Sequence, residues 1–575
     1  MPEGLPPSFS VADKRDNSIV GSLAESYMIY DDMYDRILAE EGDEGIQRVL
    51  ENLQQDSLST AFSGVEAAAT ASGSIREVFS RRTGVELGPA RVLHQVEWNE
   101  HCVKELLPLA RKHDTCIFRN IRQFFRKDLQ QNIHDLLTQP QMAVEILGPL
   151  LAAGKAMQLC GDCVTHGKQC RLRPASRHIA GTSCRPFSRK GSGLLTADPE
   201  ILFTLAWIGL RLELQETEII SENVRSHGSS SLAKAATCLD SQSSTVPDAG
   251  LGHLLIRFLG DKYWMERAVL DPCLLGFPVA REREFIVCHH KVKCLATLSP
   301  VSRFQKRFYR ACAWSWHQFF FMHLDCVQER QLGVVVDELQ EELRWEHDKS
   351  MNSVEVSNLQ DTAVWESSLS AMEWRFLQEY RCRWPGTAYM LNQDPSAGHG
   401  HPANSKALFT LTSSMGLIWT DSPENVPHRW LAPTEALVCQ GFPVVPFLHD
   451  SYLTKPICCF HVASPDRGGR HVFQQAGNSM HVAVMAVLQL HTHSCVELNR
   501  PSPLMMQISA SRQAVRAQNK RKIRDSPDGD CEASAVKFTD IPRFRLRSKS
   551  PAPFKRNIDR TAVTRHAAVL HFLSK

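Results

Sequence analysis

Between residues 56 and 290, short apolar runs typical of β-strands alternate with segments that carry helical periodicity. Three of these runs, at 59–62, 92–96 and 116–118, end in small or polar residues, and each is followed by a helical pattern. The alternation predicts an α/β fold built on a doubly wound, Rossmann-like sheet. Sheets of this kind bind nucleoside-type cofactors at the carboxyl ends of their strands.

The first two strand ends carry candidates for such a cofactor site. Gly64 separates a strand from a helix and allows the chain to turn sharply. Glu97 follows the second strand, where an acid commonly binds ribose hydroxyls, and the adjacent Trp98 offers a surface for a flat base. The alternatives are a plain strand-to-helix turn at Gly64 and a strand-end salt bridge beside a core tryptophan.

Cys184 is the candidate nucleophile, because it lies among small residues just after the strand-like step at 179–180. Exposure and nearby positive charge favour a reactive thiolate, and Arg185 and Arg189 supply that charge. The alternative is that Cys184 is a small buried apolar side chain, the commoner role of a cysteine.

An acid and two arginines follow later in the same region. Glu222 ends a strand expected at 218–221, where a buried acid can donate a proton. Arg281 and Arg283 precede an apolar strand, and their spacing puts both on one face, where guanidinium groups can hold an oxygen or the Glu222 carboxylate. A turn at Glu222 and a surface charge patch at the arginines are the alternatives.

The pattern changes at both ends and in the middle of the chain. Residues 1–55 form an extension with an acidic helix, expected at the surface or against a partner. Residues 291–424 lack the α/β rhythm, and helices are expected there at 304–325, 332–347 and 365–383. Capped helices follow at 433–440 and 482–490, within a closing segment at 425–499.

Composition indicates an intracellular, soluble protein with free thiols. The 575 residues are 43% hydrophobic and 22% charged, and the 18 cysteines show no secreted framework or leader segment. The longest apolar runs are too short to span a bilayer, so no membrane contact is expected. The basic cluster 520–524 in the tail 500–575 is typical of nuclear import or nucleic-acid binding, with a merely solvated tail as the alternative.

The segment before Cys184 contains Cys160, Cys163, His166 and Cys170. Its Cys-x2-Cys start resembles the spacing of zinc ligands, but a second well-spaced pair is missing. Ordinary thiols are therefore the preferred interpretation, and no metal is expected.

Taken together and in order, these motifs resemble the cytosine-C5 DNA methyltransferase family. The matching segments are Phe62-Ser63-Gly64, Glu97-Trp98, the loop around Cys184, Glu222-Asn223-Val224, Arg281-Glu282-Arg283, residues 429–443 and Gly477-Asn478-Ser479. The sequence departs from the family pattern at Ser183, Arg185, Val279, Asn120 and Glu66-Ala67.

The resemblance implies a catalytic domain at 56–290 that is completed by 425–499, with a smaller target-recognition domain at 291–424. It implies catalytic roles for Cys184, Glu222, Arg281 and Arg283. It also implies S-adenosylmethionine as cofactor, bound by Phe62, Ser63, Gly64, Val65, Glu97, Trp98, Asn120, Ile121, Asn478 and Ser479.

The expected function is therefore transfer of a methyl group to carbon 5 of a flipped-out cytosine in DNA, in the nucleus, through a covalent Cys184 adduct. Two alternatives stay open. One is a tRNA cytosine-5 methyltransferase, because a related branch with the same motifs acts on RNA. The other is an inactive, methyltransferase-like protein that binds nucleic acid.

Overall fold

The computed structural model describes residues 19–186, 192, 194–224, 250–297, 299–320, 366, 369–391, 393–396, 407–412, 418–421, 428, 431, 433–444 and 469–499. They belong to one compact unit that ends at Arg500. Arg189, the helix expected at 332–347, Arg429, Trp430 and the basic tail lie outside the described residues. The domain boundaries at 55, 290 and 424 stay predictions.

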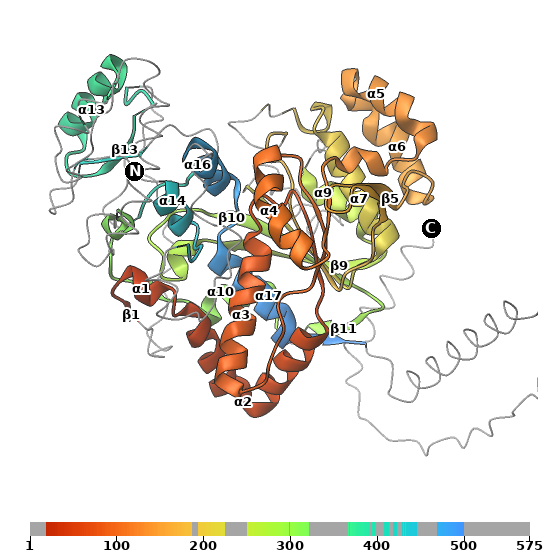
Figure 1. Cartoon of the computed structure of the whole chain (residues 1–575), viewed down its shortest axis with the longest axis horizontal. Helices are drawn as coiled ribbons and strands as arrows, with labels where there is room; N and C mark the ends of the chain where they lie inside the picture. Colours follow the sequence, from red (N-terminus) through yellow and green to blue (C-terminus); the bar gives the residue numbers. More distant parts are fainter. Residues whose placement is uncertain are drawn as a thin grey trace, which may run out of the picture. The chain divides into compact units, whose positions relative to one another are not determined.

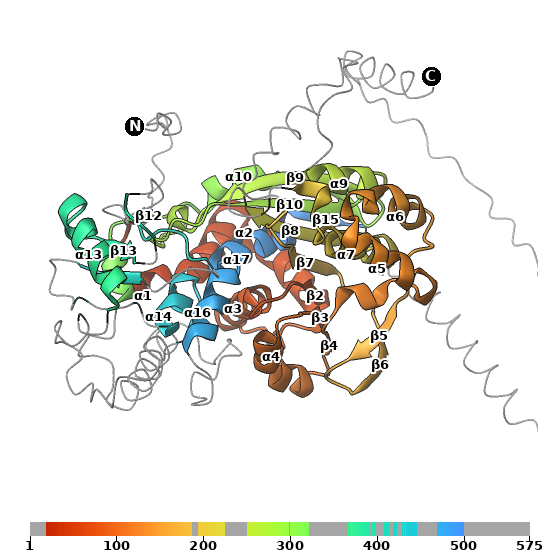
Figure 2. The same cartoon turned by 90° about the horizontal axis from the view of Figure 1, so that it is seen from above.

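A seven-stranded sheet forms the centre of the unit and confirms the predicted α/β fold (Figures 1 and 2). In spatial order its strands are β4 (Cys116–Phe118), β3 (Val92–Val96), β2 (Leu58–Ala61), β7 (Arg177–Gly181), β8 (Glu218–Val224), β10 (Arg283–His290) and β9 (Tyr263–Leu270). The first five strands are parallel, and β10 is antiparallel to both of its neighbours. The strand order reverses between β2 and β7, which is where ligands bind in sheets of this type.

Both faces of the sheet are buried under helices, so adjacent residues of one strand enter different cores. In β8, Ile219 packs into one apolar cluster and Ile220 into the other. One face carries α2 (Ile29–Gln55), α3 (Ala67–Thr83), α10 (Val301–Arg307) and α17 (Val482–Cys495). The other carries α5 (Gln130–Thr138), α6 (Ala143–Ala152), α7 (Ile201–Leu214) and α9 (Leu251–Leu259). Figure 1 shows these two groups on opposite sides of the strands.

The N-terminal helix α2 is part of the core, which differs from the expected surface or docking helix. Its apolar side chains join the cluster formed by α3 and α17. The Asn52 side-chain amide donates to the His493 carbonyl oxygen at 2.7 Å, and the hydroxyl of Tyr27, just before α2, donates to the Phe442 carbonyl oxygen at 2.9 Å. The sequence shows apolar residues at helical spacing in this segment, but not the elements against which they pack.

The remaining elements are shorter. They are β1 (Ile19–Val20), α1 (Leu23–Ser26), α4 (Glu100–Lys112), β5 (Cys160–Cys163), β6 (Lys168–Arg171), β11 (Cys294–Thr297), β12 (Ala311–Cys312), α13 (Ala371–Arg383), β13 (Ala388–Met390), β14 (Ile418–Thr420), α14 (Pro433–Cys439), α16 (Gly469–Asn478) and β15 (Val496–Leu498). Within 304–320, the described part of the helix expected at 304–325, the structure has the end of α10, β12 and a short 3-10 turn, Trp316–Phe319. Among the described residues, no helix combines the length and apolar character needed to cross a bilayer.

Candidate active site

The turn from β2 to α3 forms the first wall of the site. Phe62, Gly64 and Glu66 all have positive φ angles, of 55°, 54° and 65°. The Phe62 N–H donates to the Val96 carbonyl oxygen at 2.7 Å, which aligns this turn with the end of β3. Positive φ at two non-glycine residues costs about 1–3 kcal/mol each, and such strain is concentrated at functional sites.

Glu97 fixes the second strand end against this turn. Its two carboxylate oxygens accept hydrogen bonds from the backbone N–H groups of Gly64 and Asn99, each at 2.7 Å. Burial raises the pKa of the Glu97 carboxyl, while these backbone donors act in the opposite direction. The adjacent Trp98 is 76% exposed, so its ring is available to a ligand.

A cavity of about 400 Å³ opens along these strand ends. Of the predicted cofactor residues it is lined by Phe62, Gly64, Glu97, Trp98, Asn120, Ile121 and Asn478. Ser63 and Ser479 line a small adjoining cavity, whereas Val65 is buried in the core beside α3. The sequence motifs therefore converge on one place, with Asn478 entering from the end of α16.

The candidate nucleophile follows the central strand β7. Gly181 ends this strand opposite Glu222 of β8, and Cys184 is exposed three residues later. The Asn223 side-chain amide donates to the backbone and side-chain oxygens of Thr182, at 3.3 and 3.1 Å. Asn223 thus joins the Cys184 loop to the strand that carries Glu222.

Glu222 and Arg283 form an ion pair beside this loop. Arg283 Nε lies 3.1 Å from a Glu222 carboxylate oxygen, and both side chains are largely buried. A methyl group at Gly181 would come within 3.2 Å of the other Glu222 oxygen and 3.0 Å of Met480 Cε. Glycine at 181 therefore leaves the space that the Glu222 carboxylate needs.

Arg281, which was expected to hold an oxygen or the Glu222 carboxylate, donates hydrogen bonds to three backbone carbonyl oxygens. Its buried guanidinium donates to the carbonyl oxygens of Leu411, Gly477 and Ser479, at 2.7, 3.2 and 2.5 Å. Arg281 therefore joins the closing segment to the strand region, which is a positioning role.

Burial and neighbouring charges shift the pKa of Arg281. Burial and then the charge of Arg283 lower the pKa of Arg281 to about 9, while Glu222 and Cys184 act in the opposite direction. The pKa of Arg281 is therefore sensitive to the charges of Cys184, Glu222 and Arg283.

Arg185, which was expected to favour a Cys184 thiolate, has its charge offset by two acids. Its guanidinium lies 3.7 Å from Asp198 and 3.6 Å from Glu200. Glu200 also accepts a hydrogen bond from the Ser183 hydroxyl. The Arg185 side chain is 64% exposed, so these ion pairs hold the loop only weakly, but they offset part of its positive charge.

Sequence reasoning missed several residues that complete the cavity. Glu200, Phe203 and Thr204 come from the start of α7, and Arg119 from the end of β4. The acidic pair Asp198 and Glu200 before an apolar helix is the one signal in the sequence that pointed to this segment.

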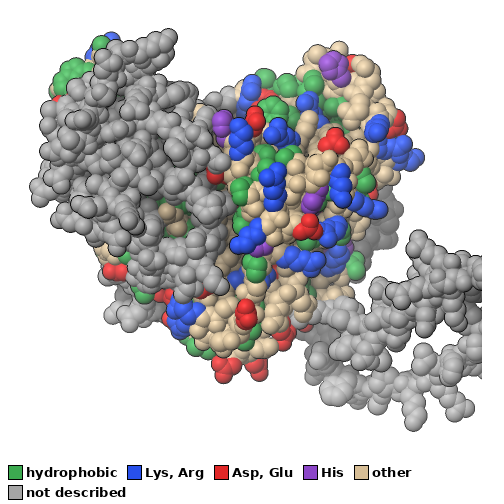
Figure 3. All heavy atoms as spheres, in the orientation of Figure 1, with side chains coloured by type: hydrophobic (Ala, Val, Ile, Leu, Met, Phe, Trp, Pro, Cys, Tyr) green, Lys and Arg blue, Asp and Glu red, His purple; other side chains and the backbone are tan. Residues whose placement is uncertain are grey.

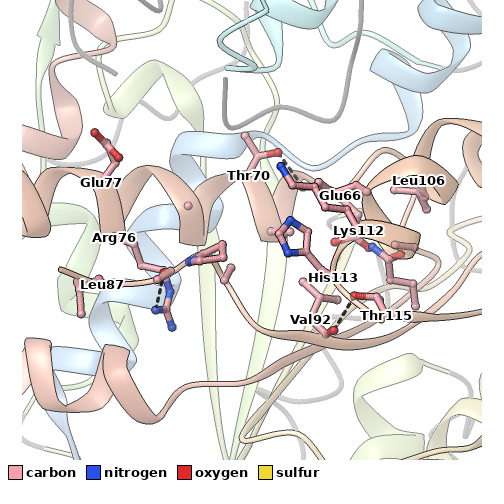
Figure 4. A pocket seen from close by; sticks show the side chains of 18 of the residues that line it. Glu66, Thr70, Arg76, Glu77, Leu87, Val92, Leu106, Lys112, His113 and Thr115 are labelled. Atoms are coloured by element: carbon pink, nitrogen blue, oxygen red, sulfur yellow. Dashed lines mark hydrogen bonds between the residues drawn. The ribbon is translucent and has the colours of Figure 1, made fainter. Parts of the chain in front are cut away.

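A second cavity, of about 480 Å³, lies between α3, α4 and residues 86–90 (Figure 4). Arg76, Glu77, Leu106 and His113 are among its lining residues. Cys184, Glu222 and Arg283 are not part of this lining. The cavity at the strand ends, which Gly181 and Ser183 line, is therefore the one next to the candidate nucleophile Cys184.

The sheet and its strand-end cavity define a doubly wound α/β protein with a cavity next to the point where the strand order reverses. No protein-family model matches the chain, and no curated protein matches it. Similar solved structures include the methyltransferase EhMeth of Entamoeba histolytica, with 12% identity, a TM-score of 0.38 and coverage of 76% of this chain and 98% of that chain.

Two further structures resemble the chain to a similar degree. The Dnmt2 methyltransferase of S. pombe has 13% identity, a TM-score of 0.35 and coverage of 76% and 97% of the two chains. A putative DNA modification methyltransferase encoded within an E. coli prophage has 13% identity, a TM-score of 0.34 and coverage of 76% and 99%. All three TM-scores are below 0.5, so the description of the fold rests on the order and direction of the strands in this structure.

Proposed function

We propose that this chain is a DNA cytosine-C5 methyltransferase that uses Cys184 as nucleophile and S-adenosylmethionine as cofactor. One observation supports the proposal most: the loop after β7 borders both halves of the site. Gly181 and Ser183 line the cavity assigned to the cofactor, and Cys184 follows at once. Gly181 is paired with Glu222, which is bound by Arg283, and Thr182 accepts hydrogen bonds from Asn223. Such a loop can present a nucleophile to a base next to a bound methyl donor.

The cavity has the donors and the space that S-adenosylmethionine requires. The Glu97 carboxylate accepts backbone N–H groups, and the about four lone-pair sites of a carboxylate leave capacity for a ribose hydroxyl. Gly64 has open space on its side-chain face, so a ligand can approach its backbone. The exposed Trp98 can stack on the adenine, and the bound cofactor would supply an electrophilic methyl group.

Carbon 5 of cytosine is a weak nucleophile, and Cys184 overcomes this by covalent catalysis. Its thiolate adds to carbon 6, which makes carbon 5 an enamine carbon that can accept a methyl group. Glu222, held by Arg283, binds ring N3 and the exocyclic amine and stabilises the charge that develops. Transfer of the methyl group to carbon 5 would break its bond to the sulfonium sulfur and leave the demethylated cofactor, a neutral thioether. Loss of the carbon 5 proton to a water molecule then breaks the bond between the Cys184 sulfur and carbon 6 and releases Cys184 as a thiolate.

DNA is the proposed substrate, and the nucleus the proposed location. The basic tail 500–575 supports both, because Lys and Arg clusters bind phosphate backbones and act as nuclear-import signals. On the face drawn in Figure 3, Lys and Arg side chains are spread over much of the described surface. The cytosine has to leave the duplex stack to reach Cys184, as in other base-modifying enzymes.

Transfer of a labelled methyl group tests this function. The full chain is incubated with labelled S-adenosylmethionine and either duplex DNA or tRNA. We expect label in cytosine of DNA, loss of that label with Cys184→Ser, and retention with Cys160→Ser, a change at an exposed cysteine outside the site. Label in tRNA alone would assign the RNA reaction.

A second candidate function, nucleic-acid binding without methyl transfer, is favoured by one observation. The positive charge nearest to Cys184 in sequence is offset by Asp198 and Glu200, which weakens the activation of a thiolate. If neither nucleic acid acquires label while DNA still binds, this function replaces the enzymatic one.

A further inference from the structure

Four side chains that can bind a metal converge at the edge of the sheet, away from Cys184. They are Cys116 of β4, Cys163 of β5, His166 of the turn between β5 and β6, and Cys170 of β6. Their three sulfur atoms and one imidazole nitrogen all lie within 4.8 Å of one another. Figure 2 shows β5 and β6 close to β4.

The distances within this Cys3His cluster match a tetrahedral zinc site. His166 Nδ1 lies 3.6 Å from Cys116 Sγ, 3.3 Å from Cys163 Sγ and 3.4 Å from Cys170 Sγ. Ideal zinc bonds of about 2.3 Å to sulfur and 2.0 Å to nitrogen at tetrahedral angles give an S···N separation of about 3.5 Å.

Hydrogen bonding alone does not account for the arrangement. The Nδ1 atom of an imidazole carries either one proton or one lone pair, so it can satisfy only one of the three sulfur atoms. A single cation at the centre would contact all four ligand atoms at once. Thiolates and imidazole are the ligands that zinc prefers.

The surroundings of His166 have the features of an outer coordination shell. Its Nε2 atom lies 2.9 Å from a carboxylate oxygen of Asp114. Histidines that bind zinc commonly donate their second ring N–H to a carboxylate, which fixes the tautomer and leaves the other nitrogen for the metal. Gly167, at φ 62°, donates its N–H to the Cys163 carbonyl oxygen at 2.9 Å and shapes the turn that presents His166.

We propose that Cys116, Cys163, His166 and Cys170 bind one structural Zn²⁺ ion. Four protein ligands leave no open coordination position, which is the mark of a structural site. The proposal replaces the expectation of ordinary thiols. The Cys-x2-Cys spacing drew attention to Cys160, but this side chain is exposed and outside the cluster, and Cys116 provides the additional sulfur.

The ion would fasten the β5–β6 hairpin to β4, the edge strand of the sheet. The Val164 N–H donates to the Ile117 carbonyl oxygen at 2.8 Å, and the Ile117 N–H donates to the Thr165 hydroxyl at 3.2 Å. The hairpin therefore covers backbone groups that an open edge would expose to other chains. At the other end of β4, Asn120 and Ile121 line the cofactor cavity, so the hairpin supports a wall of the active site.

Zinc content of the full chain tests the site. We expect about one tightly held zinc ion per chain after dialysis. We expect at least a tenfold lower content in His166→Ala and Cys170→Ala, and an unchanged content in the matched hairpin control Cys160→Ala. Equal zinc in wild type and both ligand variants would overturn the proposal.

A measurement on the wild-type chain avoids any dependence on variant folding. After exchange with Co²⁺, we expect the visible absorption of tetrahedral cobalt together with thiolate-to-cobalt charge transfer. Asp114→Asn should keep this spectrum but weaken metal affinity by about 10–100-fold. An octahedral spectrum, a disulfide among the three cysteines, or no bound metal would contradict the proposal.

Discussion

At the scale of single residues, the Glu222–Arg283 ion pair is proposed to bind the cytosine ring during the reaction. Because Glu222 contacts the base in the proposed complex, Glu222→Gln should lower kcat by about 10²–10⁴-fold and leave cofactor affinity nearly unchanged. The matched control is Glu282→Gln, an exposed position next to Arg283, which should have little effect. Steady-state kinetics and a titration with the cofactor measure the two quantities. If Glu222→Gln weakens cofactor binding as much as it lowers kcat, the role of Glu222 is structural.

The buried Glu66 carboxyl should make the stability of the protein depend on pH. Burial raises the pKa of its carboxyl from 4.5 to about 7, against hydrogen bonds from side chains such as that of Thr60. Between these two values the folded chain holds a proton that the unfolded chain releases. The stability contributed by Glu66 therefore falls as pH rises from about 4.5 through about 7.

Glu66→Gln should remove this pH dependence, because its amide stays neutral. Relative to the variant, the wild type should lose up to about 3 kcal/mol of unfolding free energy between about pH 5 and pH 8. Denaturant unfolding of both proteins at the two pH values measures the difference, with Glu86→Gln at an exposed position as control. Identical pH profiles for wild type and Glu66→Gln would show that Glu66 is not buried as described.

At the scale of elements, a buried ion network joins α2 to the sheet. Arg177 of β7 lies 2.6 Å from Glu218 of β8 and 3.2 Å from Asp56, the residue that ends α2, and all three are buried. Arg177→Ala would leave two buried carboxylates without this partner and should cost about 3–5 kcal/mol of unfolding free energy. The exposed Arg171→Ala is the control, and a cost below about 1 kcal/mol at Arg177 would contradict the integrated position of α2.

Periodicity and turn residues predicted most elements because those signals are local. The strands ending near Ala61, Val96, Phe118 and Gly181 were predicted from apolar runs, and the structure contains them. The packing of α2 was missed, since its partners in α17 are more than 400 positions away in the sequence. No local pattern reports such a contact.

The same limit applied to the candidate sites. Several residues singled out by the motif order line the strand-end cavity, but the motifs did not indicate that Arg281 donates to the carbonyl oxygens of Gly477 and Ser479. It also missed Cys116 as a neighbour of Cys163, because the two are 47 positions apart and meet only through the pairing of β4 with the hairpin. A residue's role that depends on tertiary contacts can be assigned only when the folded structure is known.

At the scale of the whole molecule, the basic tail should dominate non-specific DNA affinity. Removal of 500–575 takes away the cluster at 520–524 and the arginines that follow it. For every phosphate that the tail neutralises, its removal should make the slope of log affinity against log salt shallower by about 0.9. DNA titrations of full and truncated chains at several salt concentrations measure this slope, and equal slopes would show that the tail does not bind DNA.

The most direct test of the account is a covalent trap with duplex DNA that contains 5-fluorocytosine. Fluorine at carbon 5 leaves no proton to remove, so the bond between sulfur and carbon 6 cannot break after methyl transfer. With S-adenosylmethionine present, we expect a complex that survives denaturation, with peptide mapping that places the DNA on Cys184 and no complex from Cys184→Ser. A complex through another cysteine, or methylation of unmodified DNA by Cys184→Ser, would contradict the assignment of Cys184 as nucleophile.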